Sequence, residues 1–277
     1  MAINLVTQFL PYVDEIFSTE AKKSLVTNND FQWTGAHTVK VYKISTATMN
    51  DYDRAGEKEG SSRYGTIASL NATTEEFTLT KDRSFTFAID KMDTDETAQQ
   101  LAGATALARQ EREVIIPEVD TYIFGVMCSG AGHKPTAIAL DENNIYTELL
   151  KASEALDDAE APDTGRVLIV TPKTYNLLKQ CPDISLDCDI AQQQRLQGVI
   201  AMVDGLSVIK VPTKRLPTEF GFMVCHKVAT VAPVKLEDYK VHSDPPGISG
   251  DLVEGRIVYD AFVLDNKKNA IYYQAKA

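Results

Sequence analysis

The sequence predicts an α+β fold in which a polar β-hairpin and one long helix accompany a compact mixed domain. The first observation is a change of period: apolar side chains fall on every second residue from Phe77 to Ile89, and on every third or fourth residue from Leu101 onward. A period of two is typical of a strand and a period of about 3.6 is typical of a helix. The second observation is that residues 45–76 carry few large apolar side chains, although strand-forming segments flank them.

The composition is that of an ordinary globular protein with one large domain or two moderate ones. The chain has 277 residues, of which 44% are hydrophobic and 24% are charged. No run of 18 apolar residues occurs, so we expect no membrane span. Residues 1–17 lack a basic region and a small-residue cleavage site, so we expect no secretion signal. The cysteines show no CxxC spacing, which favours buried free thiols over a zinc site or disulfides.

The net charge is −11, and many of the acids are concentrated in one stretch. Between Asp141 and Asp163 the only base is Lys151, against Asp141, Glu142, Glu148, Glu154, Asp157, Asp158, Glu160 and Asp163. A chain this acidic repels phosphate groups, whereas a protein that reads nucleic-acid sequence shows a basic face. The sequence therefore disfavours specific DNA or RNA binding.

Residues 1–36 are predicted to form an arm. A helix that opens at Pro11 has on one face Val13, Ile16, Phe17, Ala21 and Leu25. Residues 38–45 (TVKVYKIS) then have the β-branched composition of a strand. A structureless loop as long as 45–76 is uncommon inside a compact domain. We therefore predict a projecting β-hairpin, which needs another surface to lie on because two strands alone are barely stable.

A long helix is predicted from Thr94 to Cys128, and its apolar pattern lasts about thirty residues, or roughly 45 Å at about 1.5 Å per residue. The segment DTDE at its start supplies a capping side chain and acids that suit a helix N-terminus. Pro117 lies inside this helix. A proline there removes one backbone hydrogen bond and crowds the carbonyl four residues earlier, so we predict a kink near Glu113–Pro117.

From residue 135 onward the patterns predict alternating helices and strands. The predicted helices are 143–159, 172–181 and 189–198. The predicted strands are 166–172, two strands within 199–212, 220–226, 227–234, 254–265 and 269–276. The strongest short signal is Asp204–Gly205, a dipeptide typical of a tight hairpin turn.

Residues 125–136 (GVMCSGAGHKPT) contain glycines, a lysine and a threonine that superficially resemble a phosphate-binding loop. That motif requires Gly-Lys-Ser/Thr after a strand and before a helix. Here Ala131 follows Gly130, Pro135 separates Lys134 from Thr136, and the segment follows a helix. We therefore predict that this segment only ends the long helix.

No catalytic, cofactor or metal site is predicted. The histidines share neither HxH nor HxxxH spacing, and their positions are His37, His133, His226 and His242. The acids of 141–163 do not fit the calcium-loop template, and no GxSxG motif is present. We therefore predict no catalytic residue, no cofactor and no metal.

Six stretches, in order along the chain, together resemble one family. They are TVKVYKISTATMNDYDR, FTLTKDRSFTFAIDKMDTDET, ARQEREVIIPEVDTY, IVTPKTYNLLK, VDGLSVIKVP and VEGRIVYDAFVLDNKKNAIYY. They resemble the major capsid proteins of tailed bacteriophages and prophages, which have the HK97-like fold, and the resemblance covers nearly the whole chain. It implies an N-terminal arm (1–36), a first part of the peripheral domain (37–134) with an extended loop (45–84) and a spine helix (94–128), an axial domain (135–225) and C-terminal strands of the peripheral domain (226–277).

The resemblance implies a structural role. Copies of the chain are expected to form pentamers and hexamers that close into an icosahedral head around double-stranded DNA, after assembly in the host cytoplasm. Portal and scaffolding proteins are expected partners, contact with DNA is expected to be non-specific, and no membrane is expected. Only about thirty-six residues precede the first strand, so we expect a separate scaffolding protein or none. The residues expected at intersubunit contacts are Phe9, Phe17, Trp33, Tyr52, Arg54, Lys58, Arg63 and Tyr64.

Several alternatives stay open at this point. Some family members cross-link neighbouring chains through a lysine, but nothing identifies a partner for Lys58, so we predict no covalent chemistry. An encapsulin-like nanocompartment shell with protein cargo has the same fold. A tail or baseplate component would form rings or tubes. A soluble enzyme with a site near residues 125–136 would form a small discrete oligomer.

Overall fold

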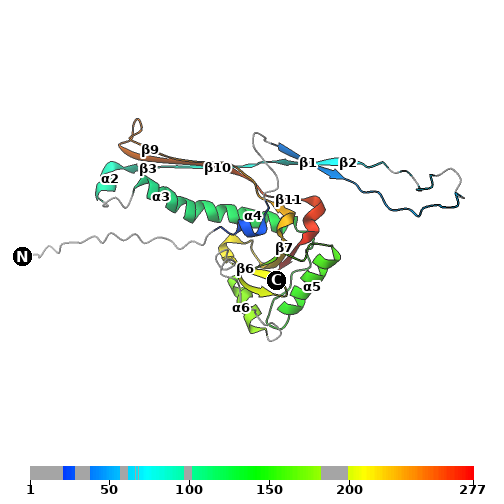
Figure 1. Cartoon of the computed structure of the whole chain (residues 1–277). Helices are drawn as coiled ribbons and strands as arrows, with labels where there is room; N and C mark the ends of the chain where they lie inside the picture. Colours follow the sequence, from blue (N-terminus) through cyan, green and yellow to red (C-terminus); the bar gives the residue numbers. More distant parts are fainter. Residues whose placement is uncertain are drawn as a thin grey trace, which may run out of the picture. The chain divides into compact units, whose positions relative to one another are not determined.

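The computed structural model describes residues 21–28, 38–56, 62–65, 67, 69–96, 102–181 and 199–277. The chain divides into two compact units, one formed by Met1–Gln32 with Thr80–Ala277 (unit 1) and one formed by Trp33–Leu79 (unit 2) (Figure 1). Several predictions fall outside the described residues: Phe9, Phe17, Trp33, Lys58, most of the arm helix, and the helix at 189–198.

Unit 2 contains the predicted β-hairpin. Strands β1 (Thr38–Ile44) and β2 (Ala72–Thr78) pair antiparallel, with a register that runs from Thr38 opposite Thr78 to Ile44 opposite Ala72. Beyond the last pair, the backbone N–H of Ser45 donates to the carbonyl of Asn71 at 3.0 Å, and the backbone N–H of Asn71 donates to Ser45 Oγ at 2.9 Å. The pairing of the segments that flank the polar stretch is thus confirmed.

The predicted single strand from Phe77 to Ile89 is wrong. It forms two strands, because β2 ends at Thr78 and β3 (Lys81–Asp90) begins in unit 1. Between them, the backbone N–H of Thr80 donates to Asp260 Oδ2 at 2.7 Å instead of to a neighbouring strand. The alternating pattern continues through this break, so the sequence period does not reveal it.

A three-stranded antiparallel sheet of unit 1 has the order β3-β10-β9, with β10 (Gly250–Tyr259) between β3 and β9 (Val234–Ser243). The buried positions of β10 alternate along the strand: Val253, Gly255, Ile257 and Tyr259. A Cβ atom on Gly255 would lie 2.3 Å from the ring of Phe85 and 2.7 Å from that of Tyr239. The glycine therefore leaves the space that these two rings occupy.

The long helix of unit 1 is continuous over α3 (Gly103–Gln110), a π-helical turn (Glu111–Ile115) and α4 (Ile116–Gly130). Figure 1 shows this helix along the three-stranded sheet. The predicted start at Thr94 is wrong, because Ala102 has an extended backbone (ψ 139°) and a separate short helix, α2, occupies Lys91–Glu96. A Cβ atom on Gly103 would lie 2.7 Å from Val241, so the helix starts where a glycine permits close packing on β9.

The π-helical turn directly precedes Pro117, in the segment for which the sequence predicts a kink. The backbone N–H of Ile116 donates to the carbonyl of Glu111, five residues earlier, as in a π-helix. Pro117 then occupies the first turn of α4, where its missing N–H is least disruptive. A bend of the helix axis at this position stays a prediction.

A five-stranded sheet of unit 1 has the order β12-β7-β4-β6-β5. Strand β4 (Arg166–Val170) runs parallel to β6 (Leu206–Lys210), and the other neighbours are antiparallel: β5 (Val199–Val203), β7 (Phe220–His226) and β12 (Ile271–Ala275). Asp204 and Gly205 have positive φ angles of 49° and 73° between β5 and β6, so the predicted tight turn is confirmed. Helix α5 (Ile145–Asp158) contacts β12 of this sheet, and helix α6 (Pro172–Gln180) contacts β4. Separately, β8 (Thr230–Val231) pairs with β11 (Phe262–Val263).

The assignment of all C-terminal strands to one group, at 226–277, is wrong for β12. This strand pairs with β7, with Ile271 opposite Cys225, and so joins the sheet built from residues 166–226. Ile271 and Tyr272 are both buried. Consecutive buried residues show that both faces of the strand are covered, and such a run carries no alternation that would identify its partner.

Unit 1 has one large hydrophobic core. Phe124 and Met127 of α4 are completely buried in the same cluster as Leu149 of α5, Ile169 of β4 and Met223 of β7. Because α4 packs into this cluster, the long helix belongs to the same core as the five-stranded sheet. Among the described residues, no helix combines the length and apolarity needed to cross a bilayer.

The three cysteines in the described residues are free and buried, as the sequence predicts: Cys128, Cys181 and Cys225. Burial raises the pKa of the Cys128 and Cys225 thiols to about 12. A thiol with such a pKa is almost entirely protonated at neutral pH, and the protonated form is a poor nucleophile. These cysteines therefore act as small apolar side chains of the core.

A buried ion pair connects the long helix to two distant segments. Arg215 Nη1 lies 2.8 Å from Asp120 Oδ2, and both side chains are at most 5% exposed. The backbone N–H of Lys22 donates to the same carboxylate oxygen at 3.2 Å. Burial raises the pKa of Asp120, while the Lys22 N–H and the Arg215 guanidinium oppose this shift. Asn28 adds a backbone bridge to Val231, so residues 22–28 dock on their own unit.

A second buried carboxylate holds the chain at the point where it enters β3. Asp260 is 2% exposed and accepts hydrogen bonds from the backbone N–H and the hydroxyl of Thr80, at 2.7 and 2.8 Å. It also accepts from the Tyr122 hydroxyl at 2.7 Å and from the backbone N–H of Ala261 at 2.8 Å. The first residue of unit 1 after the hairpin is thus fixed to the long helix.

Removing one partner of the buried pair is expected to destabilise the subunit strongly. Arg215→Met leaves the Asp120 carboxylate buried without its cation, which costs about 3–5 kcal/mol in the free energy of unfolding. The matched control is Arg256→Met, which breaks an ion pair to Asp82 whose side chains are both about half exposed. Urea unfolding of both variants measures the difference; equal midpoints for the two would contradict the importance of the buried pair.

The subunit is expected to lose stability between pH 10 and 12. Burial raises the pKa of Tyr122, Tyr239 and Tyr259 from 10.0 to about 12, so the folded state keeps protons that the unfolded state releases. Stability from this source is complete below pH 10 and is lost as the pH rises through 12. Thermal melting across this range, followed together with tyrosinate absorbance, measures the effect; a constant melting temperature would show that these hydroxyls titrate normally.

Candidate intersubunit surface

Unit 2 exposes many large apolar side chains. Seven of them are between 53% and 98% exposed: Tyr42, Ile44, Met49, Tyr52, Tyr64, Ile67 and Leu70. Single exposed apolar residues are normal, but a monomeric protein rarely collects this many in one short segment. The described residues of unit 2 therefore have the character of a contact surface.

Polar contacts order the far part of the hairpin. The backbone N–H of Asp53 donates to the carbonyl of Arg63 at 2.9 Å, and the backbone N–H of Gly56 donates to Asp53 Oδ1 at 2.8 Å. Gly65 adopts a φ of 86°, and a Cβ atom there would lie 2.7 Å from Asn50. Turns and backbone contacts give this segment a defined conformation without a core of its own.

Four of the predicted contact residues lie in this segment, and all four are exposed: Tyr52, Arg54, Arg63 and Tyr64. The rings of Tyr52 and Tyr64 meet edge to face, with centroids 5.1 Å apart. The structure thus brings these two tyrosines together from opposite sides of the loop. Tyrosine and arginine are enriched among the residues that dominate binding energy at interfaces.

The strands of the hairpin are held in register by cross-strand pairs. Lys40 forms an ion pair with Glu76, which raises the pKa of Lys40 through a side-chain hydrogen bond. Lys43 Nζ lies 3.0 Å from Glu75 Oε2. Such pairs select one register but contribute little stability at exposed positions. The ribbon is therefore specified by its pairing rather than by a core.

Five exposed apolar residues were not predicted as contact residues: Tyr42, Ile44, Met49, Ile67 and Leu70. The sequence contains a signal for them, since each stands in or beside the polar stretch that cannot form a core. The prediction chose aromatic and basic residues of the loop, and it overlooked Tyr42 of the strand and four isolated non-aromatic apolar residues. Exposure depends on what covers a side chain in space, which the residue type alone does not specify.

The glycine-containing stretch at 125–136 uses its backbone for packing. The backbone N–H of Gly132 donates to the carbonyl of Lys268 at 2.9 Å, and that of His133 donates to the carbonyl of Ile271 at 3.2 Å. A Cβ atom on Gly130 would lie 2.8 Å from Val263. These amides are bonded to the protein, as expected for a helix end. In the part of the chain that the structure describes, no three or more His, Cys, Asp or Glu residues are placed to hold a metal.

Comparison with solved structures identifies the fold. No protein-family profile and no curated protein matches the sequence. The structure of Mycobacterium phage Che8 matches with a TM-score of 0.76 and 16% identity, covering 98% of this chain and 96% of that chain. The capsid structure of the cyanophage P-SCSP1u matches with 0.70 and 13%, covering 98% and 93%. The mature capsid of bacteriophage PhiM1 matches with 0.70 and 13%, covering 99% and 92%.

These likenesses extend over nearly the full length of both partners, so they concern the whole architecture and not one shared motif. At 16% identity or below they establish the fold. The resemblance of the six sequence stretches predicted the same fold class. The chain has the HK97-like α+β fold of phage capsid structures.

Proposed function

We propose that the chain is a major capsid protein that assembles into pentamers and hexamers of an icosahedral phage head enclosing double-stranded DNA. The observation that carries this proposal is the full-length likeness to capsid structures, with TM-scores of 0.70 or more for three of them. The exposed apolar surface of unit 2 supports it independently, because such a surface is suited to contact with further copies.

The hairpin contributes to assembly by lying on a neighbouring copy. An extended ribbon offers unpaired backbone groups along its edges, and its alternating side chains engage the partner. Each contact is modest alone, but a closed shell repeats it many times, so the assembled state becomes far more stable than any single interface. The proposal includes portal and scaffolding proteins as partners solely because the sequence resembles the phage capsid family.

The net charge of −11 suits a container for DNA. A wall of basic residues would hold the phosphate backbone through counterion release and would hinder movement of the DNA during packaging. An acidic chain does not hold the phosphate backbone in this way. Its contact with the packaged DNA is therefore non-specific. We propose no catalytic role and no cofactor.

The purified, overexpressed chain is expected to form closed shells that contain pentamers and hexamers. Electron microscopy of the particles measures this, and analysis of their contents after co-expression of the packaging components distinguishes DNA from a protein cargo. Protein-filled shells would favour the nanocompartment alternative. A small discrete oligomer at all concentrations would contradict the capsid proposal, and tubes or open rings would favour a tail component.

Deleting residues 52–68 is expected to give a folded subunit that does not assemble, because the core lies in unit 1 and the deleted segment lies in unit 2. Circular dichroism and thermal melting test folding, while sedimentation measures the particle yield. Loss of folding in the deletion variant would refute a hairpin that serves neighbouring copies.

A milder variant isolates the apolar contact. Met49→Ser with Ile67→Ser removes two side chains that are at least 87% exposed and is expected to lower the particle yield by about tenfold or more, since about 1.4 kcal/mol corresponds to a factor of ten. The matched control is Thr48→Ser, an exposed position beside Met49. Equal yields from the double variant and the control would show that these side chains make no contact.

A further inference from the structure

One end of the five-stranded sheet carries a group of lysines. Lys173 lies in the first turn of α6, Lys210 is the last residue of β6, Lys214 lies in the short helix after β6, and Lys276 follows β12. We call these four residues the lysine end. Because β4 and β6 run parallel, their carboxyl ends lie together. The pairing of Val170 with Phe222 and of Ala275 with Phe220 brings the end of β12 to the same place.

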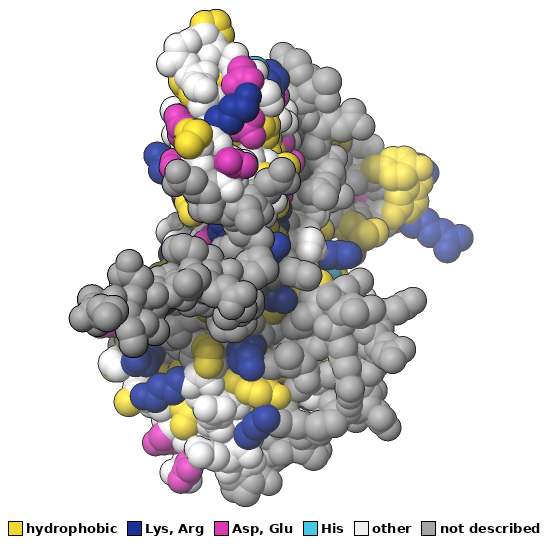
Figure 2. Space-filling view, turned by 90° about the vertical axis from the view of Figure 1, so that its left-hand side faces the viewer, with side chains coloured by type: hydrophobic (Ala, Val, Ile, Leu, Met, Phe, Trp, Pro, Cys, Tyr) yellow, Lys and Arg dark blue, Asp and Glu magenta, His cyan; other side chains and the backbone are white. Residues whose placement is uncertain are grey.

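Among the described residues, none of these four lysines has an ion-pair partner. Lys210 lies over the ring of Tyr175 at 5.6 Å, which places an aromatic side chain within the group. Figure 2 faces the side on which Figure 1 draws α6 and β6, and it shows Lys and Arg side chains gathered beside apolar ones on the lower body. In a chain of net charge −11, such a concentration of unpaired cations is unexpected.

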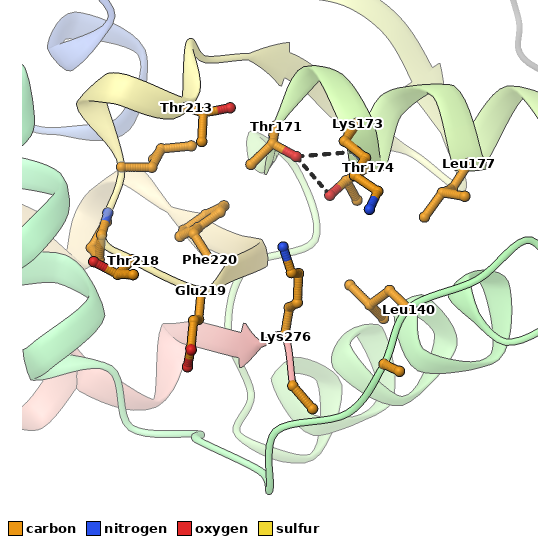
Figure 3. A pocket seen from close by; sticks show the side chains of 14 residues that line it. Leu140, Thr171, Lys173, Thr174, Leu177, Thr213, Thr218, Glu219, Phe220 and Lys276 are labelled. Atoms are coloured by element: carbon orange, nitrogen blue, oxygen red, sulfur yellow. Dashed lines mark hydrogen bonds between the residues drawn. The ribbon is translucent and has the colours of Figure 1, made fainter.

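A pocket of about 510 Å³ opens at the lysine end. Its lining includes Lys173, Lys276, Thr171, Thr174, Leu177 and Phe220. Figure 3 shows the side-chain nitrogens of Lys173 and Lys276 directed into the pocket from different elements, while the Glu219 carboxylate points away from both. Two ammonium groups at one opening favour a carboxylate-bearing partner.

Exposed acids gather at the opposite end of the same sheet, beside α5, β4 and the β5–β6 turn. These acids, which we call the acidic end, are Asp157, Asp158, Glu160, Asp163 and Asp204. Arg166, the first residue of β4, is buried beside these acids and lies 2.6 Å from Asp157 and 2.9 Å from Asp163. Lys227, Lys267 and Lys268 lie at the same end of the sheet but beside β7 and β12, so the acids are concentrated at the part formed by α5, β4 and the β5–β6 turn. Asp204 reaches this end because it forms the β5–β6 turn just before the parallel strand β6.

The positions of these charges on their own helices are informative. Asp157 and Asp158 occupy the last turn of α5, where the helix dipole disfavours acids, and Lys173 lies in the first turn of α6, where it disfavours cations. Both placements weaken the helix that carries them. Asp157 is compensated by its ion pair with the buried Arg166, but stability of the isolated subunit does not explain Asp158 or Lys173.

A single copy cannot neutralise one end with the other. The five residues of β4 separate the two ends by roughly 15 Å at about 3.3 Å per residue, farther than a lysine side chain extends. We propose that the lysine end of one copy contacts the acidic end of the next copy, head to tail. A heterologous contact forms a ring when its rotation closes, as it does in pentamers and hexamers. This inference therefore rests on the proposed function and specifies an electrostatic contact within those rings.

The proposal is tested by charge reversal at each end and at both ends together. One variant combines Lys173→Glu with Lys276→Glu, a second combines Asp158→Lys with Glu160→Lys, and a third carries all four substitutions. Each two-substitution variant places like charges at the contact and is expected to lower the yield of rings and shells by about tenfold or more. The third restores complementarity with reversed polarity and is expected to recover most of the yield.

Two controls separate assembly from folding and from net charge. Lys235→Glu with Lys240→Glu changes the net charge by the same amount at exposed positions of β9, in the three-stranded sheet, and is expected to assemble normally. Asp158→Lys replaces an acid at a helix C-terminus with a base, so the melting temperature of the unassembled subunit is expected to rise slightly while assembly falls. A loss of assembly with greater subunit stability cannot come from misfolding.

The outcomes distinguish this inference from the proposed function. Normal assembly of both reversal variants overturns the head-to-tail contact and leaves the capsid proposal intact. A failure of the third variant to recover assembly also overturns the contact. The contact is overturned as well if the wild type retains double-stranded DNA and Lys173→Glu with Lys276→Glu abolishes that retention, because the lysines would then bind DNA. If the wild type itself never assembles, the capsid proposal fails and this inference fails with it.

Discussion

Two strands that pair only with each other cannot form a hydrophobic core of their own, and this constraint dominates unit 2. Its strands are specified by cross-strand pairs and turns, yet seven of its large apolar side chains are exposed to solvent in the single chain. A ribbon of this kind is marginal by itself. Unit 1 is different, because α4 and the five-stranded sheet share a continuous core. The subunit therefore combines a stable body with a segment whose apolar surface is available for other molecules.

The body supplies fixed points for the segments that extend from it. Asp260 holds Thr80, the residue before β3, to Tyr122 of the long helix, and Asp120 holds the backbone of Lys22 together with Arg215. Both carboxylates are nearly or fully buried, so the bonds they make cannot be exchanged for bonds to water without exposing the core. The apolar ribbon and the two charged ends of the five-stranded sheet would then have separate roles, because apolar burial supplies affinity and complementary charge selects orientation.

Sequence patterns predicted the features that depend on near neighbours. The strand pair around the polar stretch, the Asp204–Gly205 turn and the helix end at Gly130 all follow from local residue types. Features that depend on distant residues were missed. The long helix begins at Gly103 because Val241 and Asp251 pack there, and β12 joins β7 although its buried run shows no preferred face. The lysine end consists of residues spread from 173 to 276, which only the strand topology brings together.

Amide hydrogen exchange of β1 and β2 tests most directly whether the hairpin is completed by other copies. The measurement compares the dissociated subunit with the assembled particle. If neighbouring copies cover the ribbon, its amides exchange rapidly in the subunit and at least about a hundredfold more slowly in the particle, while the amides of β4 and β7 are protected in both. Equal and strong protection of β1 and β2 in the dissociated subunit would contradict the account, because the hairpin would then be stabilised without any neighbour.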